Sequence, residues 1–498
     1  MLLTSIILYT LILSALAIGR YRSFFCYEFE DSACYHQAIW NAARGHLLSA
    51  TTSLRCQTGR YFPSVWLALL PLYALRPSPT TLMVLKTLFI GLGAVPVYLI
   101  ARLWIRGSWL PLFFSILYLF QPLLHYQNLS YFRPSRLAPT LFLFMVYLFL
   151  KARPLLFTIV SFAAIGCRPE TAFIIGAIGV WALFFKQRRH WSPYLLIGSA
   201  VAYLVVTQII MPNVYGFDYN KSQLAGNFGD DQLVLGFSET GRLVERMVTN
   251  LLHGDVGVWF RNLWGWQFLP FLISPYSLLS GPGILAAALL HRGMIQNNHL
   301  HHLAPIFPFV FLGMMHGCAR LLKRVDESGT PRRRGPRYIV SAGIAFLVLG
   351  TFFQIIGDNI PGNVNARGFP MKDLRFEDQL NLYDPIYTTL DEADRTAWDF
   401  IRQIPLDASV TATGDLLWAL SSRRELYEFG CDQERLPATD YVLANSRNLY
   451  IGAGRYCILS PAEQAELVRK ILDTGRYELT GDREGFKLLK RREAQESN

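Results

Sequence analysis

Long apolar runs follow one another through residues 1–356, and they constrain the fold of this chain more than any other feature. A helix that crosses a bilayer needs about 20 mostly apolar residues. Only 17% of the 498 residues are charged, whereas about one quarter are charged in soluble domains. We therefore predict a mainly α, polytopic transmembrane helical bundle of about 10–12 membrane segments. The clearest apolar segments are Leu2–Ile18, Leu82–Ile105, Trp109–Leu124, Leu137–Leu150, Tyr194–Met211, Leu303–Cys318 and Tyr338–Ile356.

The positive charge of the chain is concentrated in short connectors between these segments. The formal net charge is +11, but no basic–aromatic motif of the kind that binds nucleic acid occurs. Lys and Arg in short loops are typical of the cytoplasmic side of a membrane protein. We therefore exclude nucleic acid as a partner and expect membrane lipid instead. The basic connectors are Arg102/Arg106, Lys151/Arg153, Lys186–Arg189 and Arg320–Arg337.

The basic connectors also orient the chain. Arg320–Arg337 is cytoplasmic by this rule, so Tyr338–Ile356 exports the residues after Gly357. We predict a transmembrane domain over 1–356 and an extracytoplasmic domain over 357–498. The predicted outer loops are 19–61, the first one, and 212–262, a long one.

Two apolar segments admit more than one interpretation. Ala15-Leu16-Ala17 has the small-x-small form of a signal-peptide cleavage site, but no Lys or Arg precedes the apolar run, which favours a retained first helix. Phe62–Leu75 is short for a span, and counting it as one reverses the parity at Arg102 and Arg106. Either it is a re-entrant or tilted segment, or these arginines break the rule.

Two further segments place charged residues near the outer face. Leu155–Phe185 starts and ends beside cytoplasmic connectors and is broken at Gly166–Glu170, so Arg168 and Glu170 are expected at the outer turn. Leu137–Leu150 enters from outside, which places 125–136 on the outer face too. Another break, Ser280-Gly281-Pro282-Gly283 within Trp264–Leu290, predicts two short helices there.

The C-terminal region has the patterns of a small α/β domain. Leu390–Ile404 has apolar residues at helical spacing. Ser460–Asp473 opens with a capping box and a proline in the first turn, which predicts a second helix. No phosphate loop or dinucleotide fingerprint occurs. The predicted strands are Val410–Thr413, Glu425–Phe429 and Asp440–Leu443, with a hairpin over Tyr477–Lys490 around Gly481–Gly485.

The cysteine and histidine spacings do not predict a metal site. No CxxC occurs, and His299, His301 and His302 do not share one helix face. A divalent cation (Mg or Mn) stays open as a cofactor through acidic residues of the long outer loop, which are Asp218, Asp230 and Asp231. If the outer side is oxidising, one disulfide is expected in each of two groups. These groups are Cys26, Cys34 and Cys56, and Cys431 and Cys457.

Three carboxylates follow the first apolar segment in a polar loop: Glu28, Glu30 and Asp31. A carboxylate at the membrane face suits general-base chemistry on a substrate held at the lipid–water boundary. The alternative is a solvated loop face. The next stretch, Tyr35–Arg44, carries an apolar stripe that suits either a helix on the membrane surface, with Trp40 at headgroup depth, or an ordinary packing helix.

Two pairs of charged residues are candidates for binding an anionic substrate. Arg133 and Arg136 flank Pro134, and arginine binds phosphate with a bidentate fork. The alternative is a pair of interfacial arginines whose stems lie along apolar surface. Arg168 and Glu170 sit at a helix break at membrane depth, where ionisable residues are functional candidates by default. They equally suit pairing with each other.

Several short motifs resemble those of a family of uncharacterised polytopic membrane proteins, domain of unknown function 2079. The first-loop motif of that family is similar to the run from Asp31 through His36, Gln37 and Trp40 to Gly45. The family's second acid is His36 here, its histidine before Pro134 is Arg133, and its Lys–acid pair corresponds to Arg168 and Glu170. Other resembling motifs are Pro71-Leu72-Tyr73, Phe132-Arg133-Pro134, the segment from His302 to Pro308, Asp407–Ala412 and Arg423–Tyr427.

The resemblance implies a relation to the GT-C superfamily of membrane glycosyltransferases. Such enzymes take a sugar from a polyprenyl-phosphate donor on the outer face and carry a catalytic acid in the first outer loop. It therefore implies Asp31 as the catalytic acid, with Glu30 and Glu28 behind it. It also implies a plasma (inner) membrane location and a glycan, lipid or protein acceptor. The residues expected to bind substrate are His36, Gln37, Trp40, Arg133, Arg136, Arg168, Glu170 and His302.

Two other functions compete with glycosyl transfer. A transporter or flippase of a lipid-linked or anionic substrate would also use intramembrane Arg and Glu, but no clear internal repeat occurs. The altered motif positions also suit a non-catalytic membrane scaffold. The sequence therefore predicts a GT-C-like glycosyltransferase as the first of three functional hypotheses.

Overall fold

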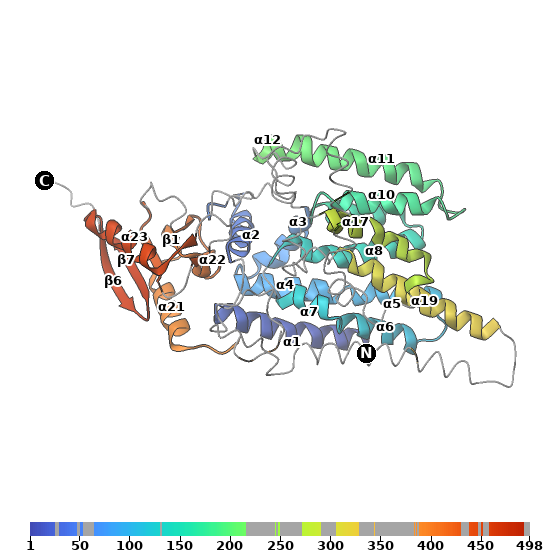
Figure 1. The fold of residues 1–498 in the computed structure, drawn as a ribbon, viewed down its shortest axis with the longest axis horizontal. Helices are drawn as coiled ribbons and strands as arrows, with labels where there is room; N and C mark the ends of the chain where they lie inside the picture. The colour runs from blue at the N-terminus through green and yellow to red at the C-terminus, as the bar shows by residue number, and fades with distance from the viewer. Residues whose placement is uncertain are drawn as a thin grey trace.

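The structure, a computed structural model, is a helical bundle with a smaller α/β domain at one end (Figure 1). It shows the fold class that the sequence predicts, and every strand of the described residues lies between Val410 and Arg491. The residues that it describes are 1–24, 29–46, 50–52, 64–129, 132–215, 245, 248–249, 271–289, 305–327, 343, 383, 385, 388–429, 438–446, 450–451 and 458–492.

The first long helix packs against the second membrane segment. Helix α1 (Leu2–Arg22) lies along α4 (Pro79–Gly91) with its chain direction reversed, because Tyr9 contacts Gly91 near the end of α4 whereas Tyr21 and Met83 share a core near its start. A Cβ at Gly91 would lie 3.1 Å from the Tyr9 ring, so a glycine there allows this close approach. Helix α5 (Ala94–Trp104) continues α4 almost directly.

Three helices of the described residues are long and apolar enough to cross a membrane: Leu2–Arg22, Pro79–Trp104 and Trp191–Asn213. The expected break within Leu155–Phe185 is confirmed, because α9 ends at Ile165 and α10 begins at Thr171. The remaining helices of the bundle are α3 (Ser64–Ala74), α6 (Trp109–Leu119), α7 (Pro122–Leu129), η2 (Pro134–Leu137), α8 (Ala138–Leu150), α9 (Pro154–Ile165), α10 (Thr171–Ala182), α11 (Trp191–Leu204), η3 (Val205–Ile210), α12 (Met211–Tyr215), η6 (Pro275–Ser280), α17 (Gly281–Leu289) and α19 (Phe307–Glu327).

Two predicted membrane segments differ from the structure or lie outside it. Trp109–Leu124 was expected as one segment, but it is divided between α6 and α7, which begins at Pro122. Proline lacks the N–H that a helix interior needs and is favoured at the first helical position. Tyr338–Ile356 falls outside the described residues apart from Gly343.

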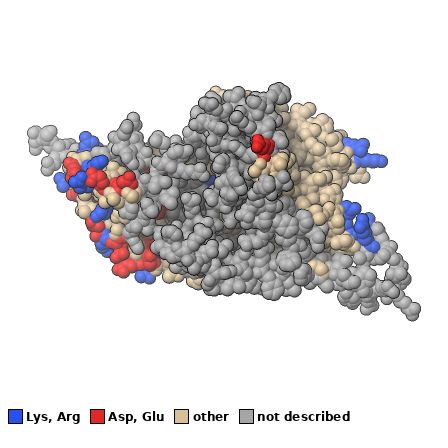
Figure 2. All heavy atoms as spheres, viewed as in Figure 1, with Lys and Arg blue, Asp and Glu red and all other residues tan. Residues whose placement is uncertain are grey.

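The flanks of the bundle expose large apolar side chains. Leu3 on α1 is 68% exposed and Ile197 on α11 is 65% exposed. In Figure 2 the described surface between the two ends of the molecule is mostly uncharged. Exposed apolar flanks of this extent are typical of helices that contact lipid.

Exposed basic side chains gather at the end of the bundle opposite the α/β domain (Figure 2). The ring centroid of Trp104, at the end of α5, lies 4.6 Å from that of Tyr276, which lies 4.6 Å from that of Trp181 near the end of α10. The connectors after α5 and α10 therefore lie at one end, so Arg102 and Arg106 agree with the other basic connectors. The exposed cations of the basic connectors are Arg102, Arg106, Lys151, Arg153, Lys186, Arg189, Arg320, Lys323 and Arg324.

Helix α3 corresponds to the short segment of doubtful parity. Its 11 residues reach only about 16 Å at 1.5 Å per residue, which is about half of a bilayer core. Its last turn lies beside α2 (Phe29–Ala42), because the Tyr73 hydroxyl bonds His36. The re-entrant or tilted interpretation of this segment stays a prediction, because residues 53–63 lie outside the described part of the chain.

The α/β domain contains one five-stranded sheet of order β2-β1-β3-β7-β6. Strand β1 is parallel to β2 and β3, and β7 is antiparallel to β3 and β6. The predicted strands, hairpin and both helices are confirmed. The elements are α21 (Glu392–Gln403), β1 (Val410–Ala412), α22 (Gly414–Leu420), β2 (Leu426–Glu428), β3 (Tyr441–Asn445), β4 (Tyr450–Ile451), β5 (Ile458–Leu459), α23 (Pro461–Asp473), β6 (Tyr477–Arg483) and β7 (Phe486–Arg491).

The two faces of the sheet have different neighbours. Helix α23 covers one face, where Val442 and Val468 share a core. Helices α21 and α22 cover the other, and the core there includes Tyr21 of α1 and Ala33 of α2. The face of the sheet that carries α22 is therefore the face that packs on the bundle.

Candidate functional site

Helix α2 (Phe29–Ala42) lies between the bundle and the α/β domain (Figure 1). Its first turn includes Glu30 and Asp31, whose side chains fall outside what the structure describes, as does all of Glu28. From Ser32 to Ile39 every residue is buried. This burial favours the packing-helix interpretation over a helix lying on the membrane surface.

The first turn of α2 is bonded to the segment that precedes η2. The Phe132 N–H donates to Ser32 Oγ over 3.2 Å, and the Tyr35 and Phe132 rings pack edge to face. Ser32 directly follows Asp31, and Arg133 directly follows Phe132. The structure thus brings together the two parts of the chain that carry the predicted acid and the predicted phosphate-binding arginines.

Buried polar side chains flank this contact inside the bundle. Lys86 is fully buried in α4, and its Nζ donates to the Asn128 carbonyl over 2.6 Å. The Thr87 hydroxyl donates to Asn128 Oδ1 over 2.8 Å. Arg136 is 1% exposed and its guanidinium donates to Gln127. We call Lys86, Thr87, Gln127, Asn128 and Arg136 the bundle cluster.

Of this cluster the motif analysis found only Arg136, and Lys86 is the charged member that it missed. A signal was present, because Lys86 is the only charged residue within the apolar run up to Arg102. A cation is costly in an apolar bundle and usually serves a substrate or ion there. Two buried cations in one cluster suit an anionic group such as a phosphate, which accepts hydrogen bonds from both Lys and Arg.

Gln37 faces the α/β domain and the short segment 50–52. Its Nε2 donates to the carbonyls of Arg423 (3.2 Å) and Arg424 (3.0 Å). Its Oε1 accepts from the Thr51 N–H (2.8 Å) and from the Thr52 hydroxyl (2.6 Å). The side chain is fully buried, so its hydrogen-bonding capacity is used within the protein.

His36 joins three helices through a one-way chain of hydrogen bonds. The Ser421 hydroxyl donates to the Trp418 carbonyl, so its oxygen accepts from His36 Nδ1–H at 2.7 Å. His36 Nε2 then accepts from the Tyr73 hydroxyl at 2.8 Å. Burial lowers the pKa of His36 to about 3, which keeps the ring neutral. We call His36, Gln37, Thr51, Thr52 and Ser421 the α2–α22 joint.

The remaining predicted site residues lie elsewhere. Arg168 and Glu170 form a bidentate ion pair at the α9–α10 break, with Nη2–Oε1 at 3.0 Å and Nε–Oε2 at 3.3 Å. Trp40 is half-buried, and the Arg44 guanidinium lies 3.5 Å from its ring centroid. His302 falls outside the described residues. All of these residues stay predictions as substrate contacts.

A metal site is not formed by the part of the chain that the structure describes. No group of three His, Cys, Asp or Glu side chains there is arranged to hold an ion. The acids of the long outer loop, Asp218, Asp230 and Asp231, fall outside that part. Cys34 is disulfide-bonded, whereas Cys167 and Cys318 are free.

Comparisons with known proteins agree with this arrangement. The family model described as "Predicted membrane protein (DUF2079)" matches residues 21–488. No curated protein matches the chain. Among solved structures, ArnT from Cupriavidus metallidurans bound to undecaprenyl phosphate matches with a TM-score of 0.52 and 11% identity, over 96% of this chain and 97% of that one. At this identity the likeness shows that the two chains share a fold.

Proposed function

The chain belongs to the DUF2079 family of predicted membrane proteins, and we propose that it is a membrane glycosyltransferase with a polyprenyl-phosphate-linked sugar as donor. The observation that carries the proposal is the bond between Phe132 N–H and Ser32 Oγ. It joins the acid-bearing turn of α2 to the segment that leads to Arg133 and Arg136. A similar fold binds undecaprenyl phosphate in ArnT, which supports a lipid phosphate as the ligand.

In this mechanism Asp31 acts as the general base. The acceptor oxygen attacks the anomeric carbon, the bond from that carbon to the phosphate oxygen breaks, and the acceptor proton passes to the Asp31 carboxylate. The products are the glycosylated acceptor and the polyprenyl phosphate. Positioned general bases contribute about 10²–10⁴-fold in rate.

The bundle cluster, together with Arg133, supplies positive charge for the departing phosphate. Lys86 and Arg136 are both buried, and fixed cations in a dry site stabilise developing negative charge far better than cations in water. The polyprenyl chain would then lie along the apolar bundle. A lipid donor also agrees with the absence of a nucleotide-binding motif from the sequence.

The location that we propose is the plasma (inner) membrane, with α2 and the α/β domain on the outer side. The basic end of the bundle lies opposite that domain, as the positive-inside rule expects. The disulfide bond of Cys34 in α2 agrees with an oxidising compartment. The acceptor is a glycan, a lipid or a protein.

Asp31→Asn tests the proposal. Full-length protein in nanodiscs is incubated with labelled undecaprenyl-phosphate-linked hexoses and membrane extract as the source of acceptor. We expect labelled product from the parent protein and about 10²–10⁴-fold less from Asp31→Asn. Glu466→Gln, at an exposed acid of α23, is the matched control and should keep the parent rate.

The outcomes separate the three functions. Equal transfer by the parent and Asp31→Asn would remove Asp31 from the mechanism. Binding of the donor without product, together with movement of the lipid between leaflets, would instead identify a flippase. If the protein neither binds the donor nor transfers the sugar, the remaining hypothesis is a non-catalytic scaffold.

A further inference from the structure

Helix α2 is held from two sides, and the second side belongs to the α/β domain. The Ser32 bond to Phe132 fixes its first turn to the bundle. About one turn later, His36 and Gln37 bond to residues that directly follow α22. Helix α2 therefore takes its position from both parts of the molecule.

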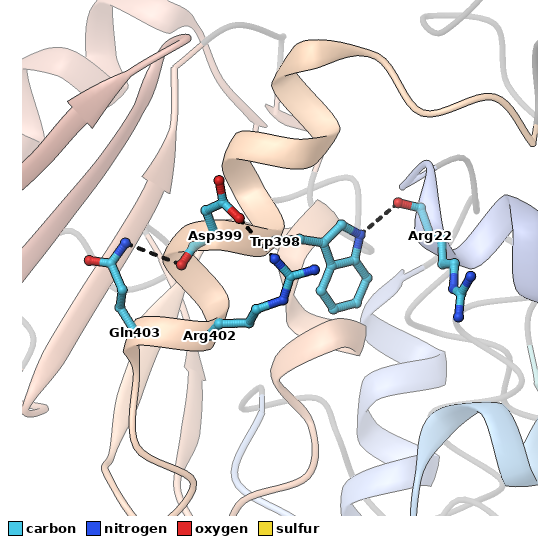
Figure 3. A network of polar contacts seen from close by, with 5 residues as sticks. All are labelled: Arg22, Trp398, Asp399, Arg402 and Gln403. Carbon is cyan, nitrogen blue, oxygen red and sulfur yellow. Dashed lines mark hydrogen bonds and ion pairs between the residues drawn. The ribbon is translucent and has the colours of Figure 1, made fainter.

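The α/β domain is anchored on the bundle independently of α2. The Trp398 indole N–H donates to the Arg22 carbonyl at the end of α1 over 2.7 Å (Figure 3). Tyr21 packs edge to face between Trp398 and Trp418, with centroids 5.5 and 5.2 Å away. Phe24 lies 5.1 Å from the Trp398 ring. This aromatic contact gives α22 a fixed base on α1.

The acceptors that Gln37 uses are also held rigidly. The Arg423 guanidinium is buried and donates to the carbonyls of Leu420 (2.7 Å) and Ala408 (2.9 Å). This fixes the turn after α22, whose carbonyls at Arg423 and Arg424 accept from Gln37. Because both the Gln37 side chain and the turn after α22 are fixed, the position of that turn determines the position of α2.

Segment 50–52 links α2 to the edge of the sheet. The Thr51 hydroxyl donates to the Leu426 carbonyl and accepts from the Leu426 N–H, both over 3.0 Å. Strand β2 is an edge strand, so these bonds use backbone groups that the sheet leaves open. Gln37 Oε1 accepts from Thr51 and Thr52 in turn, which ties α2 to β2.

From this geometry we infer that the α/β domain positions the acid-bearing turn of α2, and that Gln37 is the positioning residue through which it does so. The catalytic consequence of this positioning rests on the proposed function, in which Asp31 is the general base. Gln37 is not placed in contact with substrate here. It acts through α2, by fixing where Asp31 stands relative to the bundle cluster.

The experiment measures amide hydrogen exchange and transfer kinetics on the full-length protein. Gln37→Met keeps the volume of the side chain and removes its hydrogen bonds. We expect exchange in 29–42 to accelerate at least tenfold, with no change in 79–91 of α4. We also expect kcat to fall at least tenfold while KM for the undecaprenyl-phosphate-linked donor stays within twofold, because the donor's contacts lie in the bundle.

Gln464→Met is the matched control. Like Gln37, Gln464 is a fully buried glutamine, but it belongs to the α/β domain and lies on α23, on the face of the sheet away from the bundle. It should leave exchange in 29–42 and kcat at the parent values. An equal effect of both variants would reduce Gln37 to a general stabiliser of the domain and overturn the inference.

A second pair of variants covers the case in which Gln37→Met does not fold. Thr52→Val removes one bond to Gln37, and Thr52→Ser keeps the hydroxyl that makes it. Exchange in 29–42 should accelerate about threefold in Thr52→Val and return to the parent value in Thr52→Ser. Unchanged exchange in Thr52→Val would overturn the inference. If the parent protein shows no transfer, the proposed function fails, but the exchange results still decide the role of Gln37.

Discussion

The α2–α22 joint and the bundle cluster are both buried and polar, but they differ in charge. The joint contains neutral groups. Both ring nitrogens of His36, and both the amide nitrogen and the amide oxygen of Gln37, form hydrogen bonds within the protein. The bundle cluster contains two buried cations, Lys86 and Arg136. A buried neutral network whose bonds are satisfied stabilises and orients a fold, whereas buried cations in a membrane bundle suit a substrate.

This difference assigns separate tasks to neighbouring parts of one site. The bundle cluster is the part expected to bind the anionic group, and the joint is the part expected to hold α2 in place. The Ser32–Phe132 bond connects them. Substitutions in the cluster should therefore change ligand binding, and substitutions in the joint should change stability and the position of α2.

Lys86→Met gives the largest effect that this comparison predicts. Removing the ammonium group while keeping the length of the side chain should weaken binding of undecaprenyl phosphate by about 100-fold, which corresponds to about 2.7 kcal/mol. Binding is measured as thermal stabilisation of the protein in nanodiscs that contain the lipid. Undecaprenol, which has no phosphate, is the matched ligand and should bind both proteins alike.

Lys86→Arg provides the control for charge. It keeps a cation at the same position and should retain binding within about tenfold. If Lys86→Met bound undecaprenyl phosphate as tightly as the parent does, the bundle cluster would be structural in the same sense as the joint, and the comparison would fail.

The sequence predicts an element well where the residues that determine it are close together in the chain. The α/β elements were predicted well because caps and turns are local: Ser460 and Glu463 form the expected capping box, and the β6–β7 turn uses Gly485 at φ 76°. Helix α22 was missed. Its seven residues, Gly414–Leu420, are too few and too uniformly apolar to show a helical period.

The contacts of the site were beyond sequence reasoning for a different reason. Gln37 and Arg423 are 386 positions apart, and Ser32 and Phe132 are 100 apart. No local pattern in either partner indicates the other. The resemblance implies Gln37 as a substrate-binding residue, and it gives no sign of the bonds that Gln37 makes to the α/β domain. The resemblance located α2 but not what its side chains contact.

His36 in the joint predicts a pH dependence of stability. Burial lowers its pKa to about 3 in the folded protein, while the unfolded value is about 6.5. Below pH 6.5 the unfolded chain binds a proton that the folded protein does not, so stability falls as the pH decreases toward 3. At pH 5 this destabilisation is about 2 kcal/mol relative to pH 7.5.

His36→Gln removes the titrating ring and keeps a polar side chain. Its stability disadvantage relative to the parent should therefore shrink by about 2 kcal/mol between pH 7.5 and pH 5, followed by thermal unfolding in detergent. His190→Gln, at an exposed histidine, controls for the substitution. A disadvantage of His36→Gln that stays constant over this pH range would show that His36 is not held neutral by the joint.

Substitution of the Arg168–Glu170 pair has the smallest expected effect on stability and on lipid binding. In its chemistry this pair is intermediate between the bundle cluster and the joint. Like the bundle cluster it is charged, but like the joint its groups bond each other, and its side chains are 18% and 31% exposed. Partly exposed ion pairs contribute about 0–1 kcal/mol. Arg168→Gln should therefore lower stability by less than about 1 kcal/mol and leave undecaprenyl-phosphate binding within twofold.

The exchange of both residues, Arg168→Glu with Glu170→Arg, should recover the stability because it restores the pair. Loss of lipid binding in Arg168→Gln that the exchanged pair does not recover would move Arg168 into the phosphate site, and it would show that pairing in the structure does not by itself distinguish a structural charge from a functional one.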